Sequence, residues 1–232
     1  MELRQLTDRI FYYPHQTETD RPMLAYVQGD KLSLAIDAGN SSDHVAEFYQ
    51  TLQAKKLKLP DLTAMTHWHW DHTFGMQQIH GLSIAHTKTN QLLQIEKEKI
   101  QDKKYVQSLK LENPFLAKEF SDDKTIEIVP SDIQFENKLS VLLGNLTAQI
   151  FHTESPHSSD STLVYIPEEK ILFLGDATSE DFENDGYMDQ EKLKSLIKVI
   201  EQTDCTYCML GHAQPLGKIE LVDYLKSINS LS

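Results

Sequence analysis

The sequence has few basic residues and no long apolar run. Its 22 Lys and Arg stand against 35 Asp and Glu, so the formal net charge is −13. An acidic surface repels phosphate backbones, and we therefore expect no nucleic acid partner. No segment is long enough to span a bilayer, and residues 1–4 lack the basic start of a signal peptide. We accordingly expect a cytoplasmic protein that does not bind membranes.

Cysteine is scarce too, and the only two are Cys205 and Cys208. The Cys-x-x-Cys spacing occurs in redox pairs, where the first thiol stands at the start of a helix. Here residues 205–210 predict a buried strand instead. We therefore predict two core cysteines, because unpaired cysteine is commonly buried.

The rest of the composition is that of a globular protein, with 40% hydrophobic and 25% charged residues. A chain of 232 residues can bury a sizeable core within one large domain. No linker or low-complexity segment divides it. We predict a single domain over residues 1–232, and the sequence leaves its oligomeric state open.

The densest group of metal-ligand side chains is a His-Trp-His-Trp-Asp-His motif at residues 67–72. It follows an apolar run that reads as a buried strand. Alternate side chains of an extended segment share a side, so His67 and His69 face one way. Asp71 and His72 follow where the chain must turn, and they can face a second point. Imidazoles and a carboxylate are ligands that zinc and neighbouring transition metals prefer, so the motif predicts a metal site.

The pattern His67-x-His69-x-Asp71-His72 resembles the signature of the metallo-β-lactamase-fold hydrolases, and the resemblance extends along nearly the whole chain. It implies an α+β fold in which two mixed β-sheets pack face to face with helices outside each, a four-layer αββα sandwich. The order of the expected elements fits this architecture.

Hydrophobic periodicity and turn signals predict these elements. Two apolar runs, at 23–28 and 31–36, are split by Gly29-Asp30 and predict a hairpin. The remaining pattern predicts strands at 62–65, 82–85, 126–129, 133–135, 146–151, 161–166, 170–174 and 205–210, and helices at 41–56, 73–79, 190–202 and 219–228.

Residues 88–124 differ from the rest, because they are highly charged and helical in pattern. Charge runs of this kind are typical of a solvated helix face. The functional alternative is a helical insertion that forms a lid over the active site. Its apolar underside would then contain Tyr105, Phe115, Leu116 and Phe120.

Two strands of the second half end in further ligand-type residues. Apolar runs lead into Gly175-Asp176 and into Gly211-His212. By resemblance, Asp176 is the aspartate that bridges two cations and His212 is the last metal histidine. From the residues alone, His212 could equally be a core histidine. Asp37, which closes an early strand, is expected to support a ligand rather than bind metal.

The third metal histidine is either His152 or His157. The segment 151–158 resembles the family's Thr-Pro-Gly-His, but Glu-Ser-Pro precedes His157 where that triplet would stand. We select His157, because it follows a turn and precedes a new strand. His152 belongs to the preceding strand and is expected to pack there.

The resemblance thus implies two metal sites joined by Asp176. One contains His67, His69 and His157, and the other contains Asp71, His72 and His212. No ligand is a cysteine, which argues against the β-lactamase branch that uses one. Zinc is the expected divalent metal, with iron and manganese as alternatives. The remaining histidines are expected to be structural or at the surface, although one of them sits in an N-terminal loop that could reach a cleft: His15, His44, His80 and His86.

We expect a hydrolase in which a hydroxide bridging two cations attacks an ester-type carboxylic bond of a small molecule, such as a lactone or thioester. Asp71 would bind metal and orient the nucleophile or accept a proton. Tyr187 could donate a hydrogen bond to the oxyanion, as in lactone-hydrolysing relatives, or be a half-buried loop residue. A glyoxalase-II-like activity is weakened because Phe74-Gly75 replaces the usual Gly-Gly. The alternatives are a phosphodiesterase acting on a small nucleotide or RNA, and a mononuclear iron oxidoreductase acting on sulfur compounds.

Overall fold

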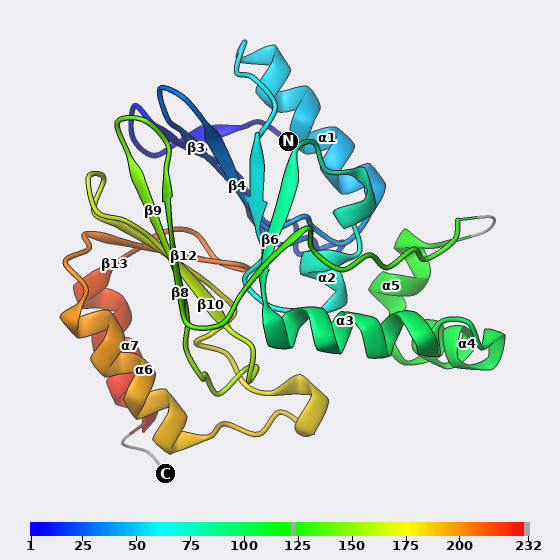
Figure 1. The fold of residues 1–232 in the computed structure, drawn as a ribbon. Coiled ribbons are helices and arrows are strands. Elements are labelled where there is room, and N and C mark those ends of the chain that lie inside the picture. Colours follow the sequence, from blue (N-terminus) through cyan, green and yellow to red (C-terminus); the bar gives the residue numbers. More distant parts are fainter. Residues whose placement is uncertain (122–123, 230–232) are drawn as a thin grey trace.

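Two β-sheets packed face to face form the centre of the molecule in the computed structural model, which describes residues 1–121 and 124–229 (Figure 1). The first sheet contains seven strands in chain order: β1 (Arg4–Gln5), β2 (Ile10–Tyr13), β3 (Leu24–Gln28), β4 (Ser33–Ile36), β5 (Leu62–Ala64), β6 (Leu82–His86) and β7 (Ile133–Phe135). Strands β1 to β4 pair antiparallel and β4 to β7 pair parallel, so this sheet is mixed.

The second sheet has six strands in the order β13-β12-β11-β10-β9-β8. Their bounds are β8 (Lys138–Leu142), β9 (Thr147–His152), β10 (Thr162–Ile166), β11 (Ile171–Gly175), β12 (Tyr207–Leu210) and β13 (Leu216–Gly217). Only β11 and β12 are parallel neighbours among these strands, so this sheet is mixed as well.

Helices cover the outer faces of both sheets (Figure 1). The helices are α1 (Ser42–Ala54), α2 (Trp70–Thr73), α3 (Thr87–Lys99), α4 (Lys103–Glu112), α5 (Pro114–Glu119), α6 (Gln190–Gln202) and α7 (Lys218–Asn229), with 3₁₀ turns at Met76–Gln78 and Phe182–Asn184. Helix α1 starts where the Ser41 hydroxyl accepts a hydrogen bond from the His44 backbone N–H. Helix α6 starts in the same way at Asp189.

The main core lies between the two sheets. Val27 and Leu34 of the first sheet and Ile150 and Val164 of the second belong to one buried cluster. Separate clusters join the outer faces to the helices, with Leu163 and Leu172 packed among side chains of α6 and α7. Burial of each such side chain stabilises the fold by about 1.5–3 kcal/mol. The four-layer αββα prediction is therefore confirmed.

Most predicted elements are present, but two predictions are wrong. The expected strand at 126–129 is irregular, because Ile128 packs into a cluster beneath the helices instead of extending a sheet. The expected helix at 73–79 is replaced by α2 and a 3₁₀ turn. Gly75 separates these two pieces, and a Cβ there would collide with the Ala38 carbonyl. Four strands at or beside a sheet edge were not predicted, although β2 has the apolar and fully buried sequence Ile-Phe-Tyr-Tyr: β1, β2, β8 and β13.

The predicted insertion is helical and comprises α3, α4 and α5, which project to one side of the sandwich (Figure 1). Residues 122–123 of the insertion and 230–232 of the predicted domain lie outside the described residues. Leu116 and Phe120 are buried, while the Tyr105 hydroxyl donates a hydrogen bond to Glu96 over 2.6 Å. Of the four expected underside residues, Phe115 is the one that lines a cavity.

Both cysteines are free and buried, with their sulfur atoms 4.0 Å apart, as expected of core residues. In the part of the chain that the structure describes, no helix has the length and apolar character needed to cross a membrane.

Candidate metal centre

The predicted metal ligands lie at the ends of strands from both sheets. His67 and His69 occupy the loop between β5 and α2, and Asp71 and His72 lie in α2 itself. The other three come from the second sheet. They follow β9, β11 and β12 along the chain and are His157, Asp176 and His212. The packing of the two sheets brings all seven into two adjoining groups.

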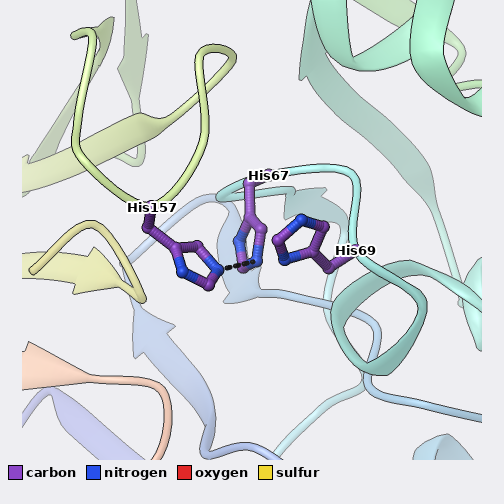
Figure 2. A group of neighbouring side chains, drawn as sticks. All are labelled: His67, His69 and His157. Carbon is purple, nitrogen blue, oxygen red and sulfur yellow. Dashed lines mark hydrogen bonds between the residues drawn. The ribbon is translucent and has the colours of Figure 1, made fainter. Parts of the chain in front are cut away.

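The first group, called here the trihistidine cluster, consists of His67, His69 and His157 (Figure 2). Its three candidate ligand nitrogens lie within 4.8 Å of one another. The rings converge from two directions, because His157 comes from the loop after β9 and the other two from the loop after β5. Nε2 of His157 lies 3.2 Å from Nε2 of His67.

Hydrogen bonds on the far side of the rings fix where their protons are. Nδ1 of His157 lies 2.7 Å from the Glu180 carbonyl, which can only accept, so the proton is on Nδ1. Nδ1 of His67 lies 3.1 Å from the Thr66 hydroxyl, whose own proton is directed to the carboxylate of Asp37. When both rings are neutral, as metal ligands are, both Nε2 atoms therefore present lone pairs to each other. Two lone pairs at this distance repel unless a cation lies close to both, so the arrangement fits a metal ion.

Two rings of the trihistidine cluster, those of His67 and His69, are also held neutral. Burial and the neighbouring imidazoles hold the pKa of His67 well below its usual value and lower the pKa of His69 to about 3. Neutral imidazole is the form that binds metal. His67 and His69 are therefore ready to accept a cation without first losing protons.

The second group, called here the carboxylate cluster, consists of Asp71, His72, Asp176 and His212. Nε2 of His212 lies 2.9 Å from Asp71 Oδ2, and Nε2 of His72 lies 3.2 Å from Asp176 Oδ2. Asp176 Oδ2 is also 3.4 Å from His212 Nε2 and 3.9 Å from His157 Nε2. One carboxylate oxygen of Asp176 thus reaches both clusters.

The pKa values of the histidines in the carboxylate cluster are raised, whereas those of His67 and His69 are lowered. Burial disfavours the charged form of His72, but the carboxylates around it outweigh burial and raise its pKa well above the usual value. Burial also opposes the charge on His212, yet Asp176 and Asp71 raise its pKa to about 10. Burial is outweighed for the acids too, since the two imidazoles hold the pKa of Asp71 and Asp176 well below their usual range. This cluster binds positive charge, which a proton or a metal cation can supply.

Asp37 connects the two clusters without entering either. Its Oδ2 lies 2.8 Å from Nδ1 of His72 and 2.9 Å from the Thr66 hydroxyl, which contacts His67. The Thr66 backbone N–H also donates to Asp37 Oδ1 over 2.7 Å. Asp37 therefore orients a histidine in each cluster, as partners of metal-binding histidines do.

Two glycines allow the ligands to approach one another. Gly175 precedes Asp176 with φ +53°, and a Cβ there would lie 2.5 Å from the Thr66 hydroxyl oxygen. A Cβ on Gly211 would collide with Asp176 Oδ1 and lie 2.9 Å from a ring carbon of His72. The Gly-Asp and Gly-His pairs of the sequence are thus required by the close contact of the two strand ends.

A match to a known protein family identifies the superfamily of this chain. The family model described as "Metallo-beta-lactamase superfamily" matches residues 24–212, a span that includes all seven candidate ligands. The chain belongs to the metallo-β-lactamase superfamily. As a member of this superfamily it is a metallo-hydrolase, and the nitrogen and oxygen donors described above fit divalent cations.

Solved structures agree on the fold. A metallo-beta-lactamase from Pontibacter korlensis is 15% identical with a TM-score of 0.71, and the match covers 100% of this chain and 99% of that one. The DIM-1 metallo-beta-lactamase is 19% identical with a TM-score of 0.69, covering 100% and 98%. The sec-alkylsulfatase Pisa1 from Pseudomonas sp. is 13% identical with a TM-score of 0.78, over 98% of this chain and 41% of that longer one. No protein of curated function matches the sequence.

The other histidines take other positions. His152 stacks on His86 with ring centroids 4.0 Å apart, so His157 and not His152 stands beside His67. His44 is buried and burial holds its pKa well below the usual value, while His80 contacts the Pro60 carbonyl. His15, in the N-terminal loop, lines a cavity next to the carboxylate cluster.

That cavity has a volume of about 580 Å³ and adjoins both clusters. Tyr187, expected to reach an oxyanion, is absent from its described lining and is 59% exposed. The same loop contributes Phe182 and Glu183 instead. Asp20, whose carboxylate lies 3.6 Å from Nδ1 of His212, also lines the cavity.

Sequence reasoning missed several of these residues. Thr66 directly precedes the motif, and that adjacency was its only signal. Asp20 has a left-handed backbone conformation with φ +53°, which only the structure reveals. Phe182 and Glu183 lie in an acidic loop whose sequence resembles an ordinary solvated turn.

Proposed function

We propose that this metallo-hydrolase is dinuclear and cleaves an ester-type carboxylic bond, such as that of a lactone or thioester, in a small molecule. The position of Asp176 Oδ2 is the observation that supports two metals, because this oxygen lies 3.2 Å from His72 Nε2 and 3.9 Å from His157 Nε2. The trihistidine cluster would hold one cation and the carboxylate cluster the other. We propose zinc for both, since every donor is an imidazole or a carboxylate.

When bound, two such cations polarise the scissile carbonyl and make water a nucleophile at neutral pH. The residues of the chain hold this chemistry in place. Asp37 and Thr66 fix the tautomers of His72 and His67 through Nδ1, which leaves Nε2 of each directed at the centre. Asp71 stays a carboxylate and can orient the attacking water or accept its proton.

The helices α3 to α5 are proposed as the lid of this site. Asn113 and Phe115 line the main cavity, and Glu96 and Lys99 line a smaller adjoining one of about 270 Å³. A buried ion pair between Arg21 and Glu119, 2.7 Å long, joins the end of the insertion to the N-terminal segment. The lid would exclude water from the cavity and position the substrate over the metals.

The first test is metal analysis of protein purified without added metal, together with a hydrolysis screen. The screen should cover lactones, thioesters, β-lactams and phosphodiesters, and also sulfate esters, because one structural relative is named an alkylsulfatase. Two divalent ions per chain with turnover of carboxylic esters supports the proposal. One iron per chain without hydrolysis, or full activity after removal of metal by a chelator, contradicts it.

A further inference from the structure

The cavity next to the metal centre combines carboxylates with aromatic rings. Beyond the candidate metal ligands, its lining includes Asp20, Glu183, Trp70, Phe115 and Phe182, and none of its described lining residues is Lys or Arg. A volume of about 580 Å³ is within the range of small-molecule sites. The acidic groups that a substrate meets away from the metals therefore stand among aromatic rings and polar side chains, with no Lys or Arg in the described lining to oppose them.

Two of the aromatic rings that line the main cavity, those of Phe115 and Phe182, are exposed. Phe182 is 68% exposed and Phe115 is 39% exposed, whereas their apolar neighbours Leu116 and Phe120 are buried. The Phe182 ring lies 5.9 Å from the ring of His157, so it stands directly beside the trihistidine cluster. Large exposed apolar rings at the edge of a polar site are available for ligand contact, and their faces attract cations.

Glu183 adds a negative charge at the same place. It lines both the main cavity and the smaller one, at their junction beside His69 and His157. Burial and the carboxylates of Glu96 and Asp181 raise the pKa of Glu183, because its charge is added to a region that is already negative. A cation placed there would relieve this repulsion.

The basic groups of the smaller cavity do not reverse its charge. Lys99 and Lys192 line it, but so do three carboxylates, those of Glu96, Asp181 and Glu183. Lys99 is also engaged by Glu96, with its ammonium 3.3 Å from the carboxylate. Apart from the metal positions, the side chains that line the two cavities thus offer no excess of positive charge to a substrate anion.

We infer that the substrate carries an organic ammonium group, which Glu183 and the rings of Phe182 and Phe115 bind while the scissile bond lies over the metal centre. This inference rests on the proposed function and specifies its substrate class. Carboxylates with aromatic faces are the combination that recognises organic ammonium ions. The two cations would offset the carboxylates that bind them, so the discrimination falls on the part of the substrate that lies away from the metals, where Asp20 and Glu183 disfavour an anion.

The test compares three acetate esters on full-length metal-loaded protein: acetylcholine as a cationic probe, 3,3-dimethylbutyl acetate as its neutral isostere, and 4-acetoxybutanoate as an anion. We expect kcat/KM for the cationic ester to exceed that for the isostere by about tenfold, the effect of one cation–π or ion-pair contact. Glu183→Gln and Phe182→Leu should each reduce that ratio by about threefold or more. Glu169→Gln, at the opposite end of β11, is the matched control and should leave it unchanged.

Binding of the alcohols choline and 3,3-dimethylbutanol, measured by calorimetric titration of the metal-loaded and the chelated protein, gives a readout independent of turnover. Tighter binding of choline that weakens in Glu183→Gln supports the inference even if no ester is hydrolysed, in which case only the proposed function fails. Equal kcat/KM for the cationic ester and its isostere, or a preference for the anion, overturns the inference and leaves the hydrolase standing. Equal binding of the two alcohols overturns it as well.

Discussion

The two halves of the metal centre are built from different chemistry, although they are in contact. In the trihistidine cluster, Nδ1 of His67 and Nδ1 of His157 make hydrogen bonds on the side away from the centre, and the pKa of His69 is lowered to about 3. The carboxylate cluster pairs two acids with two imidazoles, and the pKa of His212 is raised to about 10. The first cluster therefore supplies lone pairs, while the second supplies negative charge.

This difference has a structural origin. Each ring of the trihistidine cluster has other imidazoles as its near neighbours, with ring centroids of His69 and His157 4.6 Å apart. Each imidazole of the carboxylate cluster instead faces Asp71 or Asp176. Burial alone lowers the pKa of a histidine, and a nearby carboxylate can reverse this effect. The comparison predicts that the clusters respond differently to substitution and to pH.

The largest effect is expected where the clusters share a residue. Asp176→Asn keeps the size of the side chain but removes the charge that both clusters face, so we expect hydrolysis to fall by about 10³-fold or more, about 4 kcal/mol of barrier. Metal content should fall with it, as measured by elemental analysis. Asp30→Asn, at the surface beside Arg9, is the control. A variant Asp176→Asn with more than a tenth of the activity would show that the clusters do not depend on a shared ligand.

The next largest effect is expected on metal affinity, when the contact of Asp37 with His72 or that of Thr66 with His67 is removed. Asp37→Asn removes the charge that orients His72 and accepts from Thr66, so metal affinity should fall by about 10–100-fold. Thr66→Val removes only the hydroxyl that contacts His67, and a smaller loss is expected. Competition with a metal-binding dye measures both. A larger loss in Thr66→Val than in Asp37→Asn would reverse the assigned roles.

The stability of the metal-free protein should depend on pH in opposite ways at the two clusters. The folded-state pKa of His69, about 3, lies below the unfolded value near 6.5, so its contribution is present above pH 6.5 and is lost as the pH falls toward 3. The folded-state pKa of His212, about 10, lies above the unfolded value, so its contribution is present below pH 6.5 and is lost as the pH rises toward 10.

Urea denaturation across this pH range measures the difference. His69→Gln should flatten the acid side of the stability curve by up to about 1.4 kcal/mol per pH unit, and His212→Gln should flatten the alkaline side by up to the same slope. If both variants flatten the same side of the stability curve, the opposite pKa shifts assigned to His69 and His212 are wrong.

The smallest effect concerns the contact of His212 at the edge of the carboxylate cluster. Asp20 lies 3.6 Å from Nδ1 of His212 and both side chains are partly exposed, so Asp20→Asn should lower kcat/KM by only about two- to tenfold. Asparagine also tolerates the left-handed backbone at this position. Glu180→Gln is the matched control, because the backbone carbonyl that contacts His157 remains. Equal losses in the two variants would show that the contact with Asp20 does not support His212.

Much of the fold was predictable because its signals are local. The apolar periodicity of α1 and α6 and the hairpin at Gly29-Asp30 each depend on neighbouring residues only. The segment 126–129 shows the limit of such signals. Its apolar pattern is typical of a strand, yet Ile128 packs in a buried cluster with Leu93 and Leu116 of the helices. This contact depends on tertiary packing and leaves no local signal.

The kind of site could be predicted from contiguous patterns, namely four ligand-type residues within 67–72 and the Gly-Asp and Gly-His pairs at strand ends. Which of these residues come into contact depends on how the two sheets pack. His67 and His157 are 90 positions apart, and the packing of the two sheets places their Nε2 atoms 3.2 Å from each other. The same packing brings Glu183 and Phe182 to the cavity and leaves Tyr187 outside its lining. The physical reason is that ligand identity is a property of a residue, whereas ligand geometry is a property of the contact between remote strand ends.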